Sequence, residues 1–269
     1  MTVWELCEKI ELQDEIAAKV SRFLKDFALA SVERLICELG QPEASPDAYR
    51  ALSEQLGEDP DGTKILSCYL LAAANTYASY QSMGISDDIY FDTMKCFPRF
   101  IGETLERKGM LAFDRAHWSY RHLNMTILRI GALEYERKLR KEEKVIAIHI
   151  PSDASFDPTS LDASLSAARN LIKEKFPDCG SDPITCESWL LSESLREVLK
   201  ESSNILKFQA RFEMKEQYPD TNAPIPFIFH TSNCDDLAAL PENTSLQRNL
   251  KAWMLAGKYI GVGFGVLKE

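Results

Sequence analysis

The spacing of apolar residues changes near Ile127, and this change restricts the fold more than any other feature. Before it, apolar residues recur every three or four positions, as at Ile16, Val20 and Phe23, which is the period of an amphipathic helix. After it, they alternate or form short β-rich runs such as Val145–Ile150, which are typical of strands. The sequence therefore predicts an α+β fold, in which an N-terminal helix bundle is followed by a mixed β-sheet flanked by helices.

The second half of the chain alternates predicted strands with predicted helices. The predicted strands are Leu128–Lys138, Lys144–Ile150, Ile184–Leu191, Asn204–Met214, Phe227–Thr231 and Tyr259–Leu267. The predicted helices are Pro158–Phe176, Glu193–Lys200 and Thr244–Gly257. No helix follows Gly261, Gly263 and Gly265, so we expect close backbone packing or a bulge there rather than a phosphate-binding loop. A chain of 269 residues is long enough for two domains, which we predict at residues 1–125 and 126–269.

Composition excludes several classes of protein. The formal net charge of -10 disfavours binding to the phosphate backbone of nucleic acids. No run of about 18 apolar residues suggests a membrane span, and Met1–Glu15 lacks the basic segment of a signal peptide. The seven cysteines form no CxxC pair, which predicts neither a disulfide framework nor a metal site. Together these features predict a cytoplasmic protein that binds neither nucleic acid nor membrane; the small-molecule ligand that we expect is implied by the family resemblance described next.

Four stretches of the second half carry a resemblance to a known family. They are LRIGALEYE (Leu128–Glu136) with the residues just before it, IHIPSDASFDPTSLDASL (Ile148–Leu165), CESWLLS (Cys186–Ser192) followed by SSNILKFQARF (Ser202–Phe212), and LPENTSLQRNLKAWMLAG (Leu240–Gly257). They resemble a bacterial family of acyltransferase-like proteins, in which a helical N-terminal domain precedes a GNAT-like C-terminal domain. The resemblance implies that residues 126–269 form a GNAT-like acyltransferase domain with a CoA-type acyl donor.

The expected donor site departs from the family pattern. In GNAT enzymes the fourth and fifth strands splay apart and acyl-CoA lies in the gap, with its pyrophosphate on a glycine-rich loop. Here the corresponding strand is Lys144–Ile150 and the loop is Pro151–Asp157. The loop lacks glycine and carries Asp153 and Asp157, which oppose a pyrophosphate at close range. Asp157 before Pro158 is also typical of a helix cap, so acyl-CoA is implied by the resemblance but weakly supported by this loop.

Two residues are candidates for proton transfer. His149 ends a predicted strand, and imidazole accepts protons near neutral pH; the alternative is a histidine tied into structural hydrogen bonds. Glu134 lies among apolar residues, where a carboxylate must be ion-paired or have a perturbed pKa. Arg129 and Arg211 are possible partners of Glu134. Alternation on the predicted strand Asn204–Met214 places Arg211 on its polar face, which meets either solvent or a carboxylate, and Glu134 is the leading candidate for a buried or exposed pair with it. The predicted substrate-binding residues are Arg129, Glu187, Ser188 and Arg211.

Three functions are consistent with these residues. The leading hypothesis is an acyltransferase, in which Glu134 or His149 takes the proton from an attacking amine. The first alternative is a non-catalytic ligand-binding or interaction protein of the same fold that has lost the CoA loop. The second is hydrolysis by a Cys186–His149 pair, which requires a thiol with a lowered pKa. Binding of acyl-CoA separates the first two hypotheses.

Overall fold

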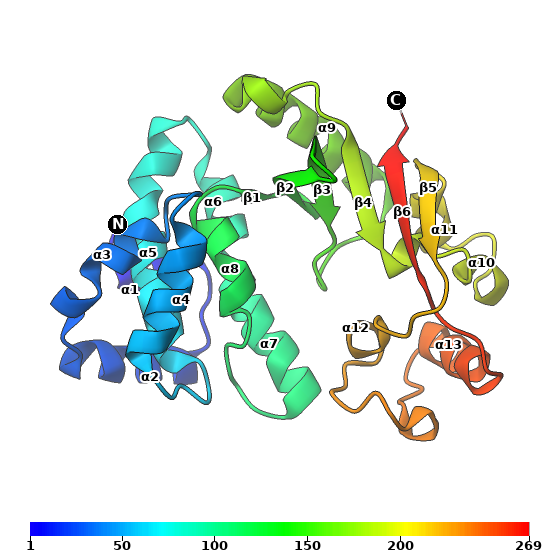
Figure 1. The fold of residues 1–269 in the computed structure, drawn as a ribbon, viewed down its shortest axis with the longest axis horizontal. Coiled ribbons are helices and arrows are strands. Elements are labelled where there is room, and N and C mark those ends of the chain that lie inside the picture. Colours follow the sequence, from blue (N-terminus) through cyan, green and yellow to red (C-terminus); the bar gives the residue numbers. More distant parts are fainter. Residues whose placement is uncertain (269) are drawn as a thin grey trace. The chain divides into compact units, whose positions relative to one another are not determined.

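The computed structural model describes residues 1–268 and divides into two compact units (Figure 1). The first unit comprises Met1–Leu105 and Gly109–Glu134, and the second comprises Glu106–Lys108 and the chain from Tyr135 onward. The division falls within one strand of the sheet, between Glu134 and Tyr135.

Helices dominate the chain before Ile127, as the sequence predicts. They are α1 (Val3–Lys9), α2 (Asp14–Asp26), α3 (Glu33–Glu38), α4 (Ser45–Leu56), α5 (Thr63–Ser82), α6 (Asp87–Met94), α7 (Cys96–Lys108) and α8 (Ala116–Leu123). The longest, α5, buries eleven of its twenty residues, because its apolar residues surround the helix instead of forming one stripe. Ser86 caps α6 by accepting a hydrogen bond from the Ile89 amide at 3.4 Å.

The sheet has six strands in the order β1-β2-β3-β4-β6-β5. They are β1 (Ile127–Ile130), β2 (Leu133–Arg140), β3 (Glu143–His149), β4 (Ile184–Ser188), β5 (Phe212–Tyr218) and β6 (Val262–Leu267). β3 and β4 are parallel, whereas β6 is antiparallel to both β4 and β5. The sheet is therefore mixed, and the predicted fold class is confirmed.

Tight connections form the first part of the sheet. Gly131 has a φ of 63° and separates β1 from β2, so the single strand predicted at Leu128–Lys138 is in fact two strands. Lys141 and Glu142 join β2 to β3, and both have left-handed backbone conformations, as the central residues of a two-residue hairpin turn require.

The second unit carries the helices α9 (Pro158–Lys175), α10 (Leu195–Val198), α11 (Asn204–Gln209), α12 (Ile225–Phe229) and α13 (Ser245–Leu255). The hydroxyl groups of Tyr135 on β2 and Ser164 on α9 are hydrogen-bonded at 2.9 Å, and both residues are buried. Residues of α10, α12, α13 and the adjoining loops form a second small core, composed of Leu195, Ile225, Ile228, Phe229, Leu240, Leu250, Met254 and Ile260. Across residues 1–268, every helix is too short or too polar to cross a bilayer.

Two predicted strands are wrong because they contain short helices. Asn204–Gln209 is α11 rather than the first half of a strand: the Ser203 hydroxyl accepts a hydrogen bond from the Ile205 amide at 3.2 Å and begins the helix. Phe208 and Gln209 are its buried residues. In a run this short, alternating apolar residues fit a helical turn as well as a strand.

The strand predicted at Phe227–Thr231 is likewise the helix α12, which has Pro226 in its first turn. Proline is favoured in the first turn of a helix because its φ is already helical and its missing N–H needs no partner. His230 ends α12 in a left-handed conformation with a φ of 50°.

The prediction for the glycines of the last strand is confirmed. A Cβ added at Gly263 would lie 2.2 Å from the Leu191 carbonyl oxygen, so the backbones approach too closely for any side chain. Opposite β6, the register of β5 shifts between Met214 and Glu216, which is the signature of a bulge.

Candidate functional site

The site is built where β3 and β4 stop pairing. The two parallel strands are joined through three residue pairs, of which Ile148 and Cys186 are the last. β3 extends one residue further to His149, and β4 extends through Glu187 to Ser188. His149 and Glu187 therefore take equivalent positions at the unpaired end of the two strands.

These side chains share one face of the sheet. Ile148 and Cys186 are both buried, and alternation along a strand places their successors His149 and Glu187 on the opposite face. Glu187 is paired with Phe264 of β6. Phe264 is in turn paired with Glu216 of β5. Two residues of β2 contact this group: Glu136 contacts His149, and Arg140 contacts Glu216. We call these six residues the polar face: His149, Glu187, Phe264, Glu216, Glu136 and Arg140.

A buried carboxylate contacts the histidine. The distance from His149 Nε2 to Glu136 Oε2 is 2.9 Å. The side chain of Glu136 is 6% exposed, whereas that of His149 is 26% exposed and so accessible from solvent. Lys138, two residues further along β2, places its ammonium 3.4 Å from the same carboxylate oxygen. In enzymes, an imidazole that accepts a proton is commonly oriented by a neighbouring carboxylate.

Arg140 organises the rest of the polar face. Its guanidinium lies 3.4 Å from the centre of the Phe264 ring, and its Nη1 donates to Glu216 Oε1 at 3.0 Å. The hydrogen bonds from Arg140, Tyr218 and Lys141 lower the pKa of the Glu216 carboxyl to about 2. Glu187 is held less firmly, because its contact with Arg140 is 3.5 Å long and its side chain is 54% exposed.

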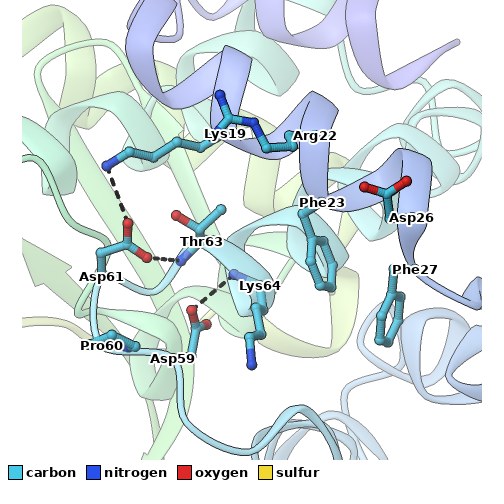
Figure 2. Close-up of a pocket in the computed structure, with 10 residues that line it drawn as sticks. All are labelled: Lys19, Arg22, Phe23, Asp26, Phe27, Asp59, Pro60, Asp61, Thr63 and Lys64. Atoms are coloured by element: carbon cyan, nitrogen blue, oxygen red, sulfur yellow. Dashed lines mark hydrogen bonds and ion pairs between the residues drawn. The ribbon is translucent and has the colours of Figure 1, made fainter.

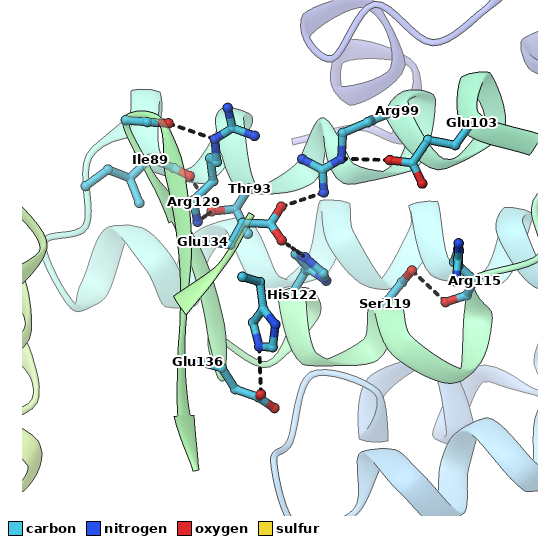
Figure 3. A network of polar contacts seen from close by, with 12 residues as sticks. Ile89, Thr93, Arg99, Glu103, Arg115, Ser119, His122, Arg129, Glu134 and Glu136 are labelled. Carbon is cyan, nitrogen blue, oxygen red and sulfur yellow. Dashed lines mark hydrogen bonds and ion pairs between the residues drawn. The ribbon is translucent and has the colours of Figure 1, made fainter. Parts of the chain in front are cut away.

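Glu134 belongs to a separate ion-pair network (Figure 3). Its carboxylate lies between Arg99, whose Nη2 is 2.5 Å from Oε1, and His122, whose Nε2 is 3.6 Å from Oε2. Burial alone would raise the pKa of Glu134, but Arg99 and His122 more than offset it and hold the pKa well below its usual value. The predicted Glu134–Arg211 pair is wrong: Arg211 binds Asp162 of α9.

The remaining candidate residues make hydrogen bonds to backbone groups. Arg211 Nη2 donates to the Pro158 carbonyl oxygen at 3.3 Å, and Arg129 Nε donates to the Gly131 carbonyl oxygen at 2.7 Å. The Ser188 hydroxyl accepts a hydrogen bond from the Leu190 amide at 3.2 Å. Of the six candidates, the structure thus brings His149, Glu187 and Ser188 to one end of β3 and β4.

Cys186 is unsuited to nucleophilic catalysis. It is fully buried, and burial raises the pKa of its thiol well above the usual value. It also lies on the face of the sheet opposite His149. The structure therefore contradicts the Cys186–His149 hydrolase hypothesis.

The loop expected to hold pyrophosphate begins a capped helix, as the sequence predicts. Asp157 Oδ2 accepts a hydrogen bond from the Ser160 amide at 2.9 Å, so this side chain occupies an N-terminal donor of α9. The preceding Phe156 packs edge-on against Phe208 of α11, with 5.5 Å between ring centres.

A hollow of about 550 Å³ lies in the first unit (Figure 2). Its lining residues are Lys19, Arg22, Phe23, Asp26, Phe27, Asp59, Pro60, Asp61, Thr63 and Lys64. Asp59 accepts hydrogen bonds from the amides of Lys64 and Ile65 at 3.1 and 2.9 Å. Asp61 accepts from the Thr63 amide at 3.1 Å and from the Lys19 ammonium at 3.2 Å. The first amides of α5 thus bind the protein's own carboxylates, which makes the hollow a poor anion site.

Sequence reasoning missed four residues of the polar face, Arg140, Glu216, Phe264 and Glu136, of which Glu136 contacts His149. The sequence signal for Glu136 was the alternation of Glu134, Glu136 and Lys138 along one strand, which places all three on one face.

In the part of the chain that the structure describes, no three His, Cys, Asp or Glu side chains are grouped closely enough to hold a metal ion.

Sequence comparison agrees with this architecture. Residues 108–267 match the family model described as a GNAT-like C-terminal domain. The chain belongs to this family. Residues 1–125 match the model of the N-acyltransferase N-terminal domain, so the two family domains follow one another along the chain. No curated protein sequence matches the chain.

Solved structures of acyltransferases share the fold of this family member. One, in complex with decanoyl-CoA and teicoplanin, superposes with a TM-score of 0.82 at 20% identity and covers 99% of this chain and 87% of that chain. A complex with CoA and 10C-teicoplanin gives the same values. A third, with decanoyl-CoA, has a TM-score of 0.71 at 18% identity and covers 99% of both chains. At these identities the likeness establishes the fold.

Proposed function

We propose that this protein is an N-acyltransferase that moves an acyl group from acyl-CoA to an amine of a small acceptor molecule. The observation that carries the proposal is His149, held 2.9 Å from the buried Glu136 where the parallel strands β3 and β4 stop pairing. The two family domains, which together span residues 1–267, support the same reaction class.

The reaction needs one proton acceptor. The amine nitrogen attacks the thioester carbonyl carbon, a C–N bond forms, the C–S bond breaks, and the CoA sulfur leaves as a thiolate. The amine must lose a proton as it attacks, and a positioned imidazole can accept that proton and return it to the departing sulfur. His149 is the partly exposed imidazole of the polar face, and the neighbouring Glu187 carboxylate can accept a hydrogen bond from the neutral amine of the acceptor.

His149 suits this role better than Glu134. A general base works best when its pKa lies near the working pH. Glu134 is buried, bound to Arg99, and its pKa is held well below the usual value. We therefore assign the Glu134 carboxylate to the stability of the first unit and assign proton transfer to His149.

An acyl-CoA donor has more support than the Pro151–Asp157 loop alone provides. The solved structures that share this fold contain decanoyl-CoA, octanoyl-CoA or CoA. The acids of the loop and the cap made by Asp157 remain a departure, so we propose that groups outside these loop amides hold the phosphates. Free cysteines and an acyl-CoA donor both fit a cytoplasmic location.

Calorimetry with decanoyl-CoA, followed by an assay of thiol release with a panel of amines, tests the proposal. We expect decanoyl-CoA to bind and at least one amine to accelerate CoA release. His149→Gln should lower kcat/KM by roughly 10²–10⁴-fold while decanoyl-CoA still binds. The matched control is His230→Gln, which removes a histidine that is 46% exposed at the end of α12 and should leave turnover unchanged.

A non-catalytic ligand-binding protein of the same fold is the second candidate. The glycine-free loop with its capped helix favours it. Absence of decanoyl-CoA binding, or binding without CoA release for every amine of the panel, would support this candidate against the enzyme.

A further inference from the structure

We propose that Glu136 is a positioning residue, which keeps the proton of the His149 ring on Nε2 and thereby makes Nδ1 the nitrogen that accepts the proton of the amine. The catalytic half of this inference rests on the proposed acyltransferase function. The structural half, which nitrogen carries the proton, stands on the geometry of the second unit alone.

The hydrogen bond determines the tautomer. His149 Nε2 lies 2.9 Å from Glu136 Oε2, and an ionised carboxylate can only accept hydrogen bonds. The Lys138 ammonium, 3.4 Å from the same oxygen, favours the ionised form. Nε2 must therefore carry the hydrogen. A neutral imidazole has only one N–H, so its lone pair resides on Nδ1.

Burial makes this restraint strong. The Glu136 side chain is 6% exposed, and a buried carboxylate that lost its partners would incur a large desolvation cost. The adjacent residue Tyr135 anchors the strand that carries Glu136, because its buried hydroxyl group is hydrogen-bonded to Ser164 of α9. Hydrogen bonds also strengthen where water is excluded. The accessible face of the imidazole is consequently presented in one orientation.

This arrangement separates two tasks. In this scheme Glu136 acts through the histidine ring, which it contacts at 2.9 Å, whereas His149 exchanges the proton. A carboxylate that holds an imidazole in one tautomer and stabilises the imidazolium formed during the reaction can contribute much of the rate. The same pairing would serve here without Glu136 ever becoming protonated.

Nitrogen NMR of the imidazole rings tests the tautomer directly. The chain has only four histidines, so spectra of His149→Gln assign the His149 signals in the ¹⁵N-labelled protein. In alkaline buffer we expect His149 to show the Nε2–H form, and Glu136→Ala to show a mixture of the two tautomers. The control Glu216→Gln alters a carboxylate of the polar face that binds Arg140 rather than His149, and should leave the tautomer unchanged.

Two results would overturn the inference: an Nδ1–H tautomer in the unaltered protein, or the same tautomer population after Glu136→Ala. Because alanine removes a buried group, Glu136→Gln is measured as well. It keeps the shape of the side chain, and its folding is checked by circular dichroism.

Kinetics tests the catalytic half. With decanoyl-CoA and the best amine of the panel, Glu136→Gln should lower kcat by on the order of 10-fold, less than loss of the base itself, while KM for decanoyl-CoA is unchanged. Glu136→Asp should restore part of kcat. If His149→Gln is inactive and Glu136→Gln retains full kcat, the positioning role is wrong and the proposed function survives. If His149→Gln remains active, the proposed base is wrong, and the NMR result still decides the tautomer.

Discussion

Replacing Arg99 by methionine removes the arginine partner of the buried Glu134 carboxylate, together with a longer contact of 3.8 Å to Glu103. Arg99 Nη2 lies 2.5 Å from Glu134 Oε1, and the two side chains are 9% and 3% exposed. Methionine retains the length and apolar character of the arginine stem but removes its charge. The Glu134 carboxylate then stays buried, with the His122 imidazole 3.6 Å away.

The expected loss of stability is large. Removing one partner of a buried ion pair costs about 3–5 kcal/mol in the free energy of unfolding, because the surviving charge stays desolvated. Arg211→Met provides a matched control, since its partner Asp162 is 67% exposed. Exposed pairs contribute only about 0–1 kcal/mol. The two substitutions are chemically identical, so the difference between them reports burial of the partner.

Urea denaturation followed by helical circular dichroism measures both variants. We expect Arg99→Met to lower the midpoint strongly and Arg211→Met to change it little. The double variant Arg99→Met/Glu134→Gln should recover part of the loss, because it removes the unpaired charge. Equal midpoints for the two single variants, or a double variant less stable than Arg99→Met, would refute the argument that an orphaned charge causes the destabilisation.

The same network predicts how stability depends on pH. The pKa of Glu134 is lower in the folded protein than in the unfolded chain. Its contribution to stability is therefore fully present above the unfolded value, about 4.3, and is lost as the pH falls from there toward the folded pKa. Glu134→Gln should remove this part of the acid destabilisation, so its unfolding free energy should fall less between pH 5 and pH 3 than that of the unaltered protein. A parallel decline in both proteins would contradict it.

Four further variants test single positions. Gly263→Ala should destabilise the protein by about 1–3 kcal/mol in thermal or urea unfolding, because the added Cβ would lie 2.2 Å from the Leu191 carbonyl oxygen. Gly102→Ala in α7 should stabilise it by about 0.5–1 kcal/mol, because no atom lies within 4 Å of the added Cβ. Asp157→Ala removes the cap of α9 and should cost about 1 kcal/mol; no change in the urea midpoint would contradict this cap. Cys186→Ser should leave acyl transfer unchanged, since the buried thiol takes no part in it; loss of kcat with intact folding would argue otherwise.

Local patterns were sufficient for much of the fold. The change from helical to strand periodicity near Ile127 marks the beginning of β1, because each period directly reflects which side of an element is buried. Asp157 followed by Pro158 predicted the beginning of α9, since a cap and a first-turn proline act within a few residues. The glycines of β6 similarly predicted close packing.

Local patterns were insufficient in two short segments. The predicted strands Asn204–Met214 and Phe227–Thr231 overlap the helices Asn204–Gln209 and Ile225–Phe229. In five or six residues a period of two and a period of about 3.6 can produce nearly the same pattern. What decided between them was the surroundings, such as the carbonyl of Ser192 that accepts a hydrogen bond from buried Gln209 at 2.8 Å.

In the candidate site, too, some features follow from the local sequence and others depend on tertiary packing. The sequence by itself determined that His149 ends a strand and that Glu134 must be ion-paired or have a perturbed pKa, because both follow from residue type and position in a strand. Only the tertiary structure decided the partners: Arg99 for Glu134, Glu136 for His149 and Asp162 for Arg211. Ion pairs form between residues distant in sequence once packing has brought them within a few ångströms, and their strength depends on burial that packing also creates. Periodicity therefore determines which elements form, whereas tertiary packing determines which charges meet.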